Sequence, residues 1–109
     1  MTPIERFNQA CENHDLDAVL ATLAEDIVFE STEPPPDGRR YQGKAAVAAV
    51  IGPILTDPDA HFEIEETIAT GDRVIQLNTY RWASGHISGV DIFRIKGEQI
   101  VQIRSYVKG

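Results

Sequence analysis

The chain has 109 residues, of which 42% are hydrophobic and 25% are charged, as is typical of a globular protein with one core. Seventeen acidic residues against ten basic ones give a formal net charge of −7, which argues against nucleic acid and anionic membranes as partners, because phosphates require a basic surface. The one cysteine cannot form an internal disulfide, and no segment approaches the ~20 apolar residues of a membrane span. We therefore expect a single-domain, cytoplasmic protein.

The N-terminal segment predicts two short helices that meet at a corner. Thr2-Pro3-Ile4-Glu5 is typical of a helix start, with Thr2 as N-cap, Pro3 at the first helical position and Glu5 closing a capping box. Cys11 lies on the apolar face of this helix and is predicted to be a small core residue. His14-Asp15 then interrupts the helix, and Asp15 caps a second one with an apolar stripe formed by Leu16, Val19, Leu20 and Leu23.

The rest of the chain predicts one more helix and a long sheet. Residues 27–30 form a short strand, and a loop with three prolines follows it. The third helix begins at Gly43 and is interrupted at Gly52-Pro53, because proline lacks the N–H that a helix needs. From His61 to Val107, alternating segments separated by tight turns predict four antiparallel strands. This order indicates an α+β fold, a cone in which three N-terminal helices pack on the concave face of a strongly curved, mainly antiparallel sheet.

Asp91 is the most informative residue of the sequence. It is the lone carboxylate in the segment 88–95, and strand alternation places it on the same face as Phe93 and Ile95. If that face is the core, the carboxyl group must find a partner, face a wet cavity or keep its proton. The alternatives are an ion pair with an arginine or an exposed position on the sheet. Arg94 is a poor partner, because it lies on the opposite face of the same strand.

The strand from Arg73 to Trp82 has a face that suits the wall of a pocket. That face mixes apolar, amide, phenol and indole groups, carried by Val74, Gln76, Asn78, Tyr80 and Trp82. The alternative is that this face is simply the solvent side of the sheet. This strand pairs with the Asp91 strand across the turn at Gly85. Its pocket-wall face and the Asp91 side chain could therefore line the same space. The three histidines stand in different elements, and no metal or cofactor motif occurs, so we expect neither a metal nor a cofactor.

Four segments, in their order and spacing, resemble the nuclear-transport-factor-two-like superfamily, in its SnoaL-like and ketosteroid-isomerase-like branch. They are residues 7–28, 41–44, 89–94 and 100–107, so the resemblance covers essentially the whole chain. It implies one cone-shaped domain spanning residues 1–109, with a deep apolar pocket and usually a homodimer. Asp91 corresponds to the position where ketosteroid isomerases keep a protonated aspartic acid as an oxyanion-hole donor.

The other two functional positions of that enzyme do not match this sequence. Its oxyanion tyrosine corresponds to Phe7, which has no hydroxyl group, and its general-base aspartate falls on or near Ser31. Glu30 and Glu33 flank that position, and either is a candidate base. Classical ketosteroid isomerisation is therefore not expected.

Two functions from different classes remain open. The first is a cofactor-free acid–base isomerase, cyclase or hydro-lyase, in which Asp91 acts on an apolar polyketide- or steroid-like carbonyl compound. The residues expected to bind this substrate are Tyr80, Trp82, Asn78, Phe7, Phe93 and Ser31. The second is a non-catalytic domain of the same fold that binds a small apolar ligand or only dimerises. In either case we expect a homodimer through the outer face of the sheet, which would carry Ile75, Leu77, Val90 and Ile92.

Overall fold

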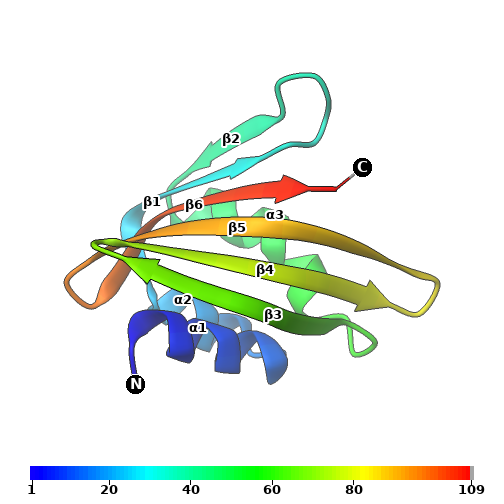
Figure 1. Ribbon diagram of the computed structural model, residues 1–109, viewed down its shortest axis with the longest axis horizontal. Helices are drawn as coiled ribbons and strands as arrows, with labels where there is room; N and C mark the ends of the chain where they lie inside the picture. The colour runs from blue at the N-terminus through cyan, green and yellow to red at the C-terminus, as the bar shows by residue number, and fades with distance from the viewer. Residues whose placement is uncertain (109) are drawn as a thin grey trace.

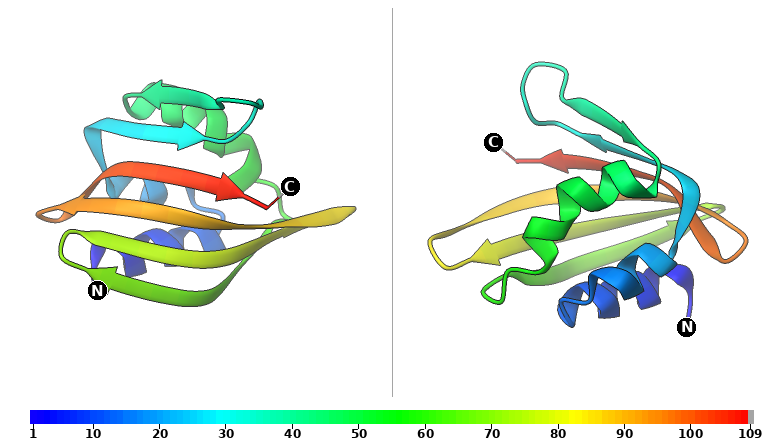
Figure 2. Two further views of the ribbon diagram at one scale, coloured as in Figure 1. Left: turned by 45° about the horizontal axis from the view of Figure 1, so that its top comes forward. Right: turned by 180° about the vertical axis from the view of Figure 1, so that it is seen from behind.

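The computed structural model describes residues 1–108 and shows a curved six-stranded sheet that covers three helices. Figure 1 views the sheet from its outer side, and the right-hand view of Figure 2 shows the helices on the inner, concave side. The helices are α1 (Pro3–Glu12), α2 (Leu16–Ala21) and α3 (Lys44–Leu55). The strands are β1 (Leu23–Ser31), β2 (Arg39–Gln42), β3 (His61–Thr70), β4 (Arg73–Trp82), β5 (Gly85–Lys96) and β6 (Gln99–Val107).

The strands lie in the order β2-β1-β6-β5-β4-β3. Strands β3 to β6 pair with their chain neighbours as an antiparallel meander, and β1 joins the sheet by pairing in parallel with β6. The α+β class and the mainly antiparallel sheet predicted from the sequence are therefore confirmed.

The two N-terminal helices begin as their capping residues predict. Thr2 Oγ1 accepts a 3.1 Å hydrogen bond from the Glu5 backbone N–H, and Glu5 Oε1 accepts one of 3.3 Å from the Thr2 N–H. Asp15 Oδ1 accepts a 3.1 Å bond from the Ala18 N–H at the start of α2. Between the helices, His14 takes a positive φ of 56°, which turns the chain sharply at the predicted corner.

Three details of the sequence interpretation were wrong or incomplete. Helix α3 does not stop at Gly52 but continues through Pro53 to Leu55, because the proline removes one donor near the helix end and the Thr56 N–H still bonds to the Gly52 carbonyl oxygen. Leu23 does not belong to α2 but begins β1, where it is fully buried. Strand β2 was not predicted; it pairs with β1 at one edge of the sheet.

The core lies between the concave face of the sheet and the helices. Its larger cluster is formed by Ile4, Leu23, Ile27, Val47, Phe93, Ile100 and Ile103. The Phe7 ring of α1 meets the Phe93 ring of β5 edge to face, with centroids 5.3 Å apart, and so fixes α1 over the middle of the sheet. Within residues 1–108, no helix is long and apolar enough to cross a membrane.

Candidate functional site

Asp91 lines a small cavity on the concave face of the sheet. The cavity has a volume of about 80 Å³ and lies between α1 and strands β3, β4 and β5. Its lining residues are Phe7, Asn8, Cys11, Glu12, Phe62, Ile64, Gln76, Asn78 and Asp91. Phe7 and Asn78, both predicted as substrate-binding residues, therefore lie beside Asp91.

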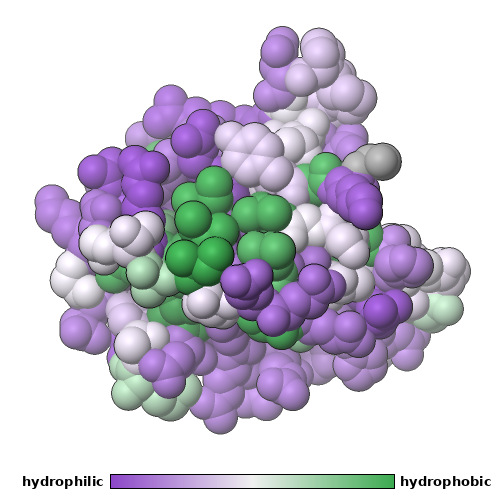
Figure 3. All heavy atoms as spheres, in the orientation of Figure 1, coloured by the Kyte–Doolittle hydropathy of each residue, from purple (hydrophilic) through white to green (hydrophobic). Residues whose placement is uncertain are grey.

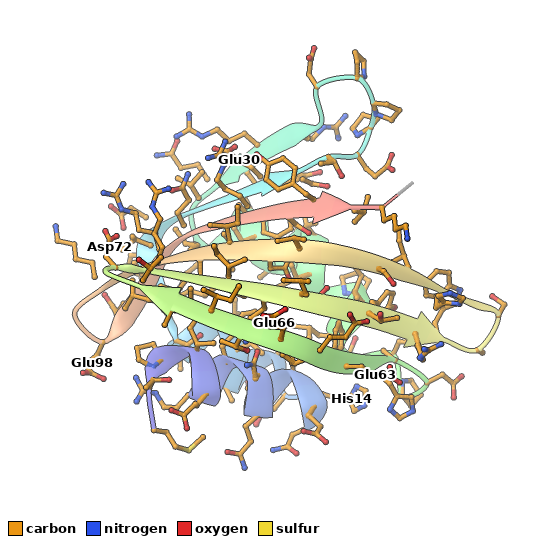
Figure 4. All side chains as sticks on the ribbon, in the orientation of Figure 1. His14, Glu30, Glu63, Glu66, Asp72 and Glu98 are labelled. Carbon is orange, nitrogen blue, oxygen red and sulfur yellow. The ribbon has the colours of Figure 1, made fainter. Side chains whose placement is uncertain are left out.

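The carboxyl group of Asp91 is held by hydrogen bonds and not by an arginine. Asn78 Nδ2 donates a 2.7 Å hydrogen bond to Asp91 Oδ2. Desolvation raises the pKa of Asp91, and side-chain hydrogen bonds from Ser105 and Asn78 oppose this rise. Among residues 1–108, no ion pair involves Asp91, and Arg94 instead donates a 2.9 Å bond to Asp72 at the β3–β4 turn (Figure 4). The ion-pair alternative for Asp91 is therefore not supported.

Gln76 is the buried amide of the cavity wall. It is the cross-strand partner of Asp91 in the β4–β5 register and is only 1% exposed. Within the described part of the chain, its Nε2 atom has no hydrogen-bond partner. Gln76 belongs to the face of β4 that the sequence suggested as a pocket wall, but it was not among the predicted site residues.

Helix α1 contributes three residues to the cavity that were not predicted from the sequence. Asn8, Cys11 and Glu12 line it together with Phe7. Their spacing of three and four positions puts them on one face of the helix, which is the signal that could have found them. Cys11 is buried, as expected of a core residue, and it also lines the cavity. Desolvation, and to a lesser extent the charge of Asp91, raises the pKa of the Cys11 thiol to about 12.

Tyr80 and Trp82 continue the concave face of β4 but do not line the Asp91 cavity. They form a stack with Phe62, in which the Phe62–Tyr80 centroids are 5.0 Å apart and the Tyr80–Trp82 centroids 5.2 Å. Trp82 Nε1 donates a 3.0 Å hydrogen bond to Ser84 Oγ in the β4–β5 turn. Phe62 is thus the one ring of the stack that reaches the cavity, and the other two rings extend it toward the turn.

Phe93 and Ser31 also lie outside the lining of this cavity. Phe93 is fully buried in the core beneath α1, so its ring supports Phe7 and is not free to contact a ligand. Ser31 lies in the same cross-strand row as Asp91, with Ser105 between them. It lines a second cavity, of about 430 Å³, that the tip of the β1–β2 hairpin forms with the end of β6.

The two predicted bases are also away from Asp91. Glu30 alternates to the outer face, where its Oε2 lies 3.5 Å from Nε of Arg104, its cross-strand partner on β6 (Figure 4). Glu33 follows β1 in the proline loop, and its backbone N–H donates to Ser31 Oγ. Glu12 is the carboxylate that shares the cavity with Asp91, and it is exposed at the C-terminal end of α1.

The outer face of the sheet carries an apolar patch. Figure 3 shows hydrophobic residues gathered at the centre of this face. The register places Ile75, Leu77, Val90 and Ile92 together on neighbouring strands, each partly exposed. Ile68 and Tyr106 extend this set, with 43% and 45% of their surface exposed.

Comparison with known proteins places the chain in a family. The SnoaL-like domain model matches residues 4–103. An NTF2-like protein of unknown function from Mesorhizobium loti is 37% identical, with a TM-score of 0.89 over 98% of this chain and 88% of that one. A SnoaL-like protein of unknown function from Burkholderia thailandensis is 28% identical, with a TM-score of 0.80 over 97% and 92% of the two chains. A search of the curated proteins finds no match. Because the family model matches residues 4–103 of this 109-residue chain, the chain belongs to the SnoaL-like domain family.

Proposed function

We propose that this protein is a cofactor-free acid–base catalyst that binds a small, uncharged carbonyl compound in the Asp91 cavity and moves a proton next to the carbonyl group. The observation that carries the proposal is the environment of Asp91. Its carboxyl group lies in the wall of a small, largely apolar cavity, with Oδ2 occupied by Asn78 and with a raised pKa. A carboxylic acid that keeps its proton can donate a hydrogen bond to a carbonyl oxygen, as a carboxylate cannot.

The size of the cavity limits the ligand. A cavity of about 80 Å³ is smaller than the ~150 Å³ cavity that accommodates benzene in a protein core. A compound of about three or four heavy atoms fits this volume, and a ring the size of benzene, such as cyclopentanone, would place its carbonyl edge here and the rest of the ring at the mouth of the cavity. A polyketide- or steroid-like compound would have to place only its reacting edge here, with the remainder outside the cavity.

The charge of the protein favours an uncharged ligand. The chain has a net charge of −7, and the cavity holds two carboxyl groups, on Asp91 and Glu12. An anionic ligand would meet a negative potential on approach and a second negative charge on binding. A neutral ketone or aldehyde meets neither.

Glu12 is the residue that we assign as the base. In the proposed step, the Glu12 carboxylate takes a proton from the carbon next to the carbonyl group, and the electrons of that C–H bond form the carbon–carbon double bond of an enol. Asp91 hydrogen-bonds to the carbonyl oxygen, or gives it a proton, as negative charge develops there. Glu12 then returns a proton to carbon, and any proton that Asp91 gave to the oxygen goes back to Asp91, so both residues are regenerated. General acid–base catalysis of this kind contributes about 10²–10⁴-fold to a rate.

The step can be tested without knowing the natural substrate. Cyclopentanone in D₂O exchanges the hydrogens beside its carbonyl group for deuterium, and proton NMR measures the rate. We expect the wild-type protein to accelerate this exchange and the Glu12→Gln variant to lose the acceleration. Glu98→Gln, which changes an exposed carboxylate at the β5–β6 turn, is the control and should leave the rate unchanged (Figure 4).

The same experiment separates the catalytic function from the alternative, a non-catalytic ligand-binding domain. Cyclopentanone that binds at the cavity without faster exchange would favour the binding domain. Cyclopentanone that neither binds nor exchanges faster would contradict both functions for a small ketone.

We also propose that the protein forms a homodimer through the apolar patch on the outer face of the sheet. The supporting observation is the set of partly exposed isoleucine, leucine and valine side chains on adjacent strands. Carboxylates lie on either side of the centre of this face, Glu30 on β1 and Glu66 on β3 (Figure 4). An apolar centre with a charged rim is the usual arrangement of a protein–protein interface.

A further inference from the structure

We propose that Gln76 is a ligand-binding residue whose side-chain amide donates a second hydrogen bond to the oxygen atom that Asp91 binds. The inference rests on the proposed function, because it assumes a ligand oxygen in the Asp91 cavity. It adds a second donor and a criterion for the ligand: the oxygen must accept two hydrogen bonds at once.

The first observation is that the Gln76 amide is buried and unpaired. The residue is 1% exposed, and within residues 1–108 its Nε2 atom has no hydrogen-bond partner. Buried polar groups in folded proteins are almost always paired, because an unpaired donor loses its bonds to water and gains nothing in return. The Gln76 side chain also lines the cavity, so we infer that its amide can turn this unpaired donor toward a ligand there.

The second observation is that a neighbouring polar residue of the same strand is fully paired. Thr79 is 3% exposed on the opposite face of β4, and its Oγ1 lies 3.0 Å from both Glu65 Oε1 and Ser88 Oγ. The strand thus pairs its buried hydroxyl group on the outer face and leaves its buried amide unpaired on the cavity face. Thr79 provides a matched control for a purely structural role.

The third observation is the register. Gln76 and Asp91 are directly opposite each other on β4 and β5, and both line the cavity. Asn78, two residues further along β4, already occupies Asp91 Oδ2. Ser105 also hydrogen-bonds to the Asp91 carboxyl group, so a ligand oxygen would bind the acid proton of Asp91 and the unpaired amide of Gln76. A carbonyl or enol oxygen has two lone pairs and can accept from both.

The first test is the stability of the protein without ligand. Gln76→Met keeps the length of the side chain and removes the unpaired donor, so we expect its Tm to stay the same or to rise by a few degrees. Thr79→Val removes a paired hydroxyl group and should lower the Tm. A Gln76→Met variant that loses stability as Thr79→Val does would show that the amide is structural, and would overturn the inference.

The second test is selectivity for the oxygen atom. Cyclopentanone and methylenecyclopentane have nearly the same shape, but only the ketone accepts hydrogen bonds, and NMR shifts of the cavity residues report the Kd of each. We expect the wild-type protein to prefer the ketone, and Gln76→Met to reduce this preference by about threefold to tenfold, the value of one hydrogen bond. Thr79→Val should keep the preference.

An Asp91→Leu variant separates this inference from the proposed function. If Gln76→Met keeps the ketone preference and Asp91→Leu loses it, the inference is wrong and the role of Asp91 stands. If Gln76→Met loses the preference and Asp91→Leu keeps it, Gln76 binds the oxygen and the role proposed for Asp91 is wrong. A wild-type protein that binds neither compound, or both equally, would overturn the inference.

Discussion

Asn78 on β4 and Asp91 on β5 share a 2.7 Å hydrogen bond, in which the amide Nδ2 donates to the carboxyl Oδ2. The bond favours the ionised form of Asp91, whereas burial favours the protonated form, and burial is the larger effect. Burial and the hydrogen bond from Asn78 therefore act on the pKa of Asp91 in opposite directions. This balance can be shifted by single substitutions.

The Asn78→Leu variant removes the donor and keeps the approximate size of the side chain. Because the lost bond stabilised the carboxylate, we expect the pKa of Asp91 to rise above its wild-type value, which is itself above the ordinary value of an aspartic acid. Carbon-detected NMR titration of the Asp91 carboxyl group measures both values. Ser105→Ala should raise the pKa in the same direction. A wild-type pKa at or below that ordinary value would contradict the proposed acid.

The Asp91→Asn variant should be more stable than the wild-type protein at neutral pH. The folded-state pKa of Asp91 is raised, so the folded protein binds its proton more tightly than the unfolded chain. The resulting stability is fully present below the unfolded pKa and is lost as the pH rises through the folded pKa. The asparagine has no charge to bury, so we expect its advantage in stability to be small near pH 4 and to grow as the pH rises through the folded-state pKa of Asp91.

Urea unfolding at several pH values tests this dependence. Asp72→Asn is the control with the opposite sign, because the hydrogen bond from Arg94 lowers the pKa of Asp72. Its contribution to stability is present above the unfolded pKa and is lost as the pH falls through the folded pKa. An Asp91→Asn variant that is less stable than the wild-type protein at pH 7 would show that the carboxylate is structural.

The sequence predicted the fold more completely than the site. Strand alternation put Asn78 and Gln76 on one face of their strand and Asp91 on the same face as Phe93, because side-chain parity is a local property of a strand. It could not show where along that face the helices leave a gap. Tyr80 and Trp82 share the parity of Asn78, yet they stack on Phe62 outside the cavity.

The missing residues of the site come from packing between elements. Which face of α1 covers the sheet depends on the contact between Phe7 and Phe93, which are far apart in the sequence. Without that contact, Cys11 could be identified only as a core residue and Glu12 as a surface one. Strand β2 was missed for a related reason: its four residues are mostly exposed, so they lack an alternating apolar pattern.

Cys11 should react slowly with thiol reagents in the folded protein. Burial raises the pKa of its thiol to about 12, and only the thiolate is nucleophilic. At pH 8 we expect labelling by a disulfide reagent to be about 10²–10³-fold slower than in the urea-unfolded chain. The charge of ionised Asp91 adds to this shift, so Asp91→Asn should accelerate labelling modestly only at a pH at which Asp91 is ionised. Equal rates for folded and unfolded protein would show that the thiol is exposed.

His14 should stabilise the corner between α1 and α2. Its Nδ1 lies 2.8 Å from the Leu55 carbonyl oxygen at the end of α3, and its φ of 56° is strained for a bulky residue. His14→Val loses the hydrogen bond and adds β-branched strain, so we expect a loss of about 2–3 kcal/mol in the free energy of unfolding. His14→Asn tolerates the backbone conformation and should lose only about 1 kcal/mol. Similar losses for both variants would mean that backbone strain is not a factor.

The Ile92→Glu variant should separate the proposed dimer into monomers. Ile92 lies in the apolar patch, opposite Ile75 on β4 and Arg104 on β6. Burying a carboxylate there against a second copy of the chain costs more free energy than the interface contacts contribute. The matched control is Ile54→Glu, an exposed residue of α3 on the other side of the sheet. Analytical ultracentrifugation at micromolar concentration should show a dimer for the wild-type protein and the control, and a monomer for Ile92→Glu. Circular dichroism checks that each variant is folded, because Ile92 is partly buried within its own chain. A monomeric wild-type protein would contradict the proposed interface.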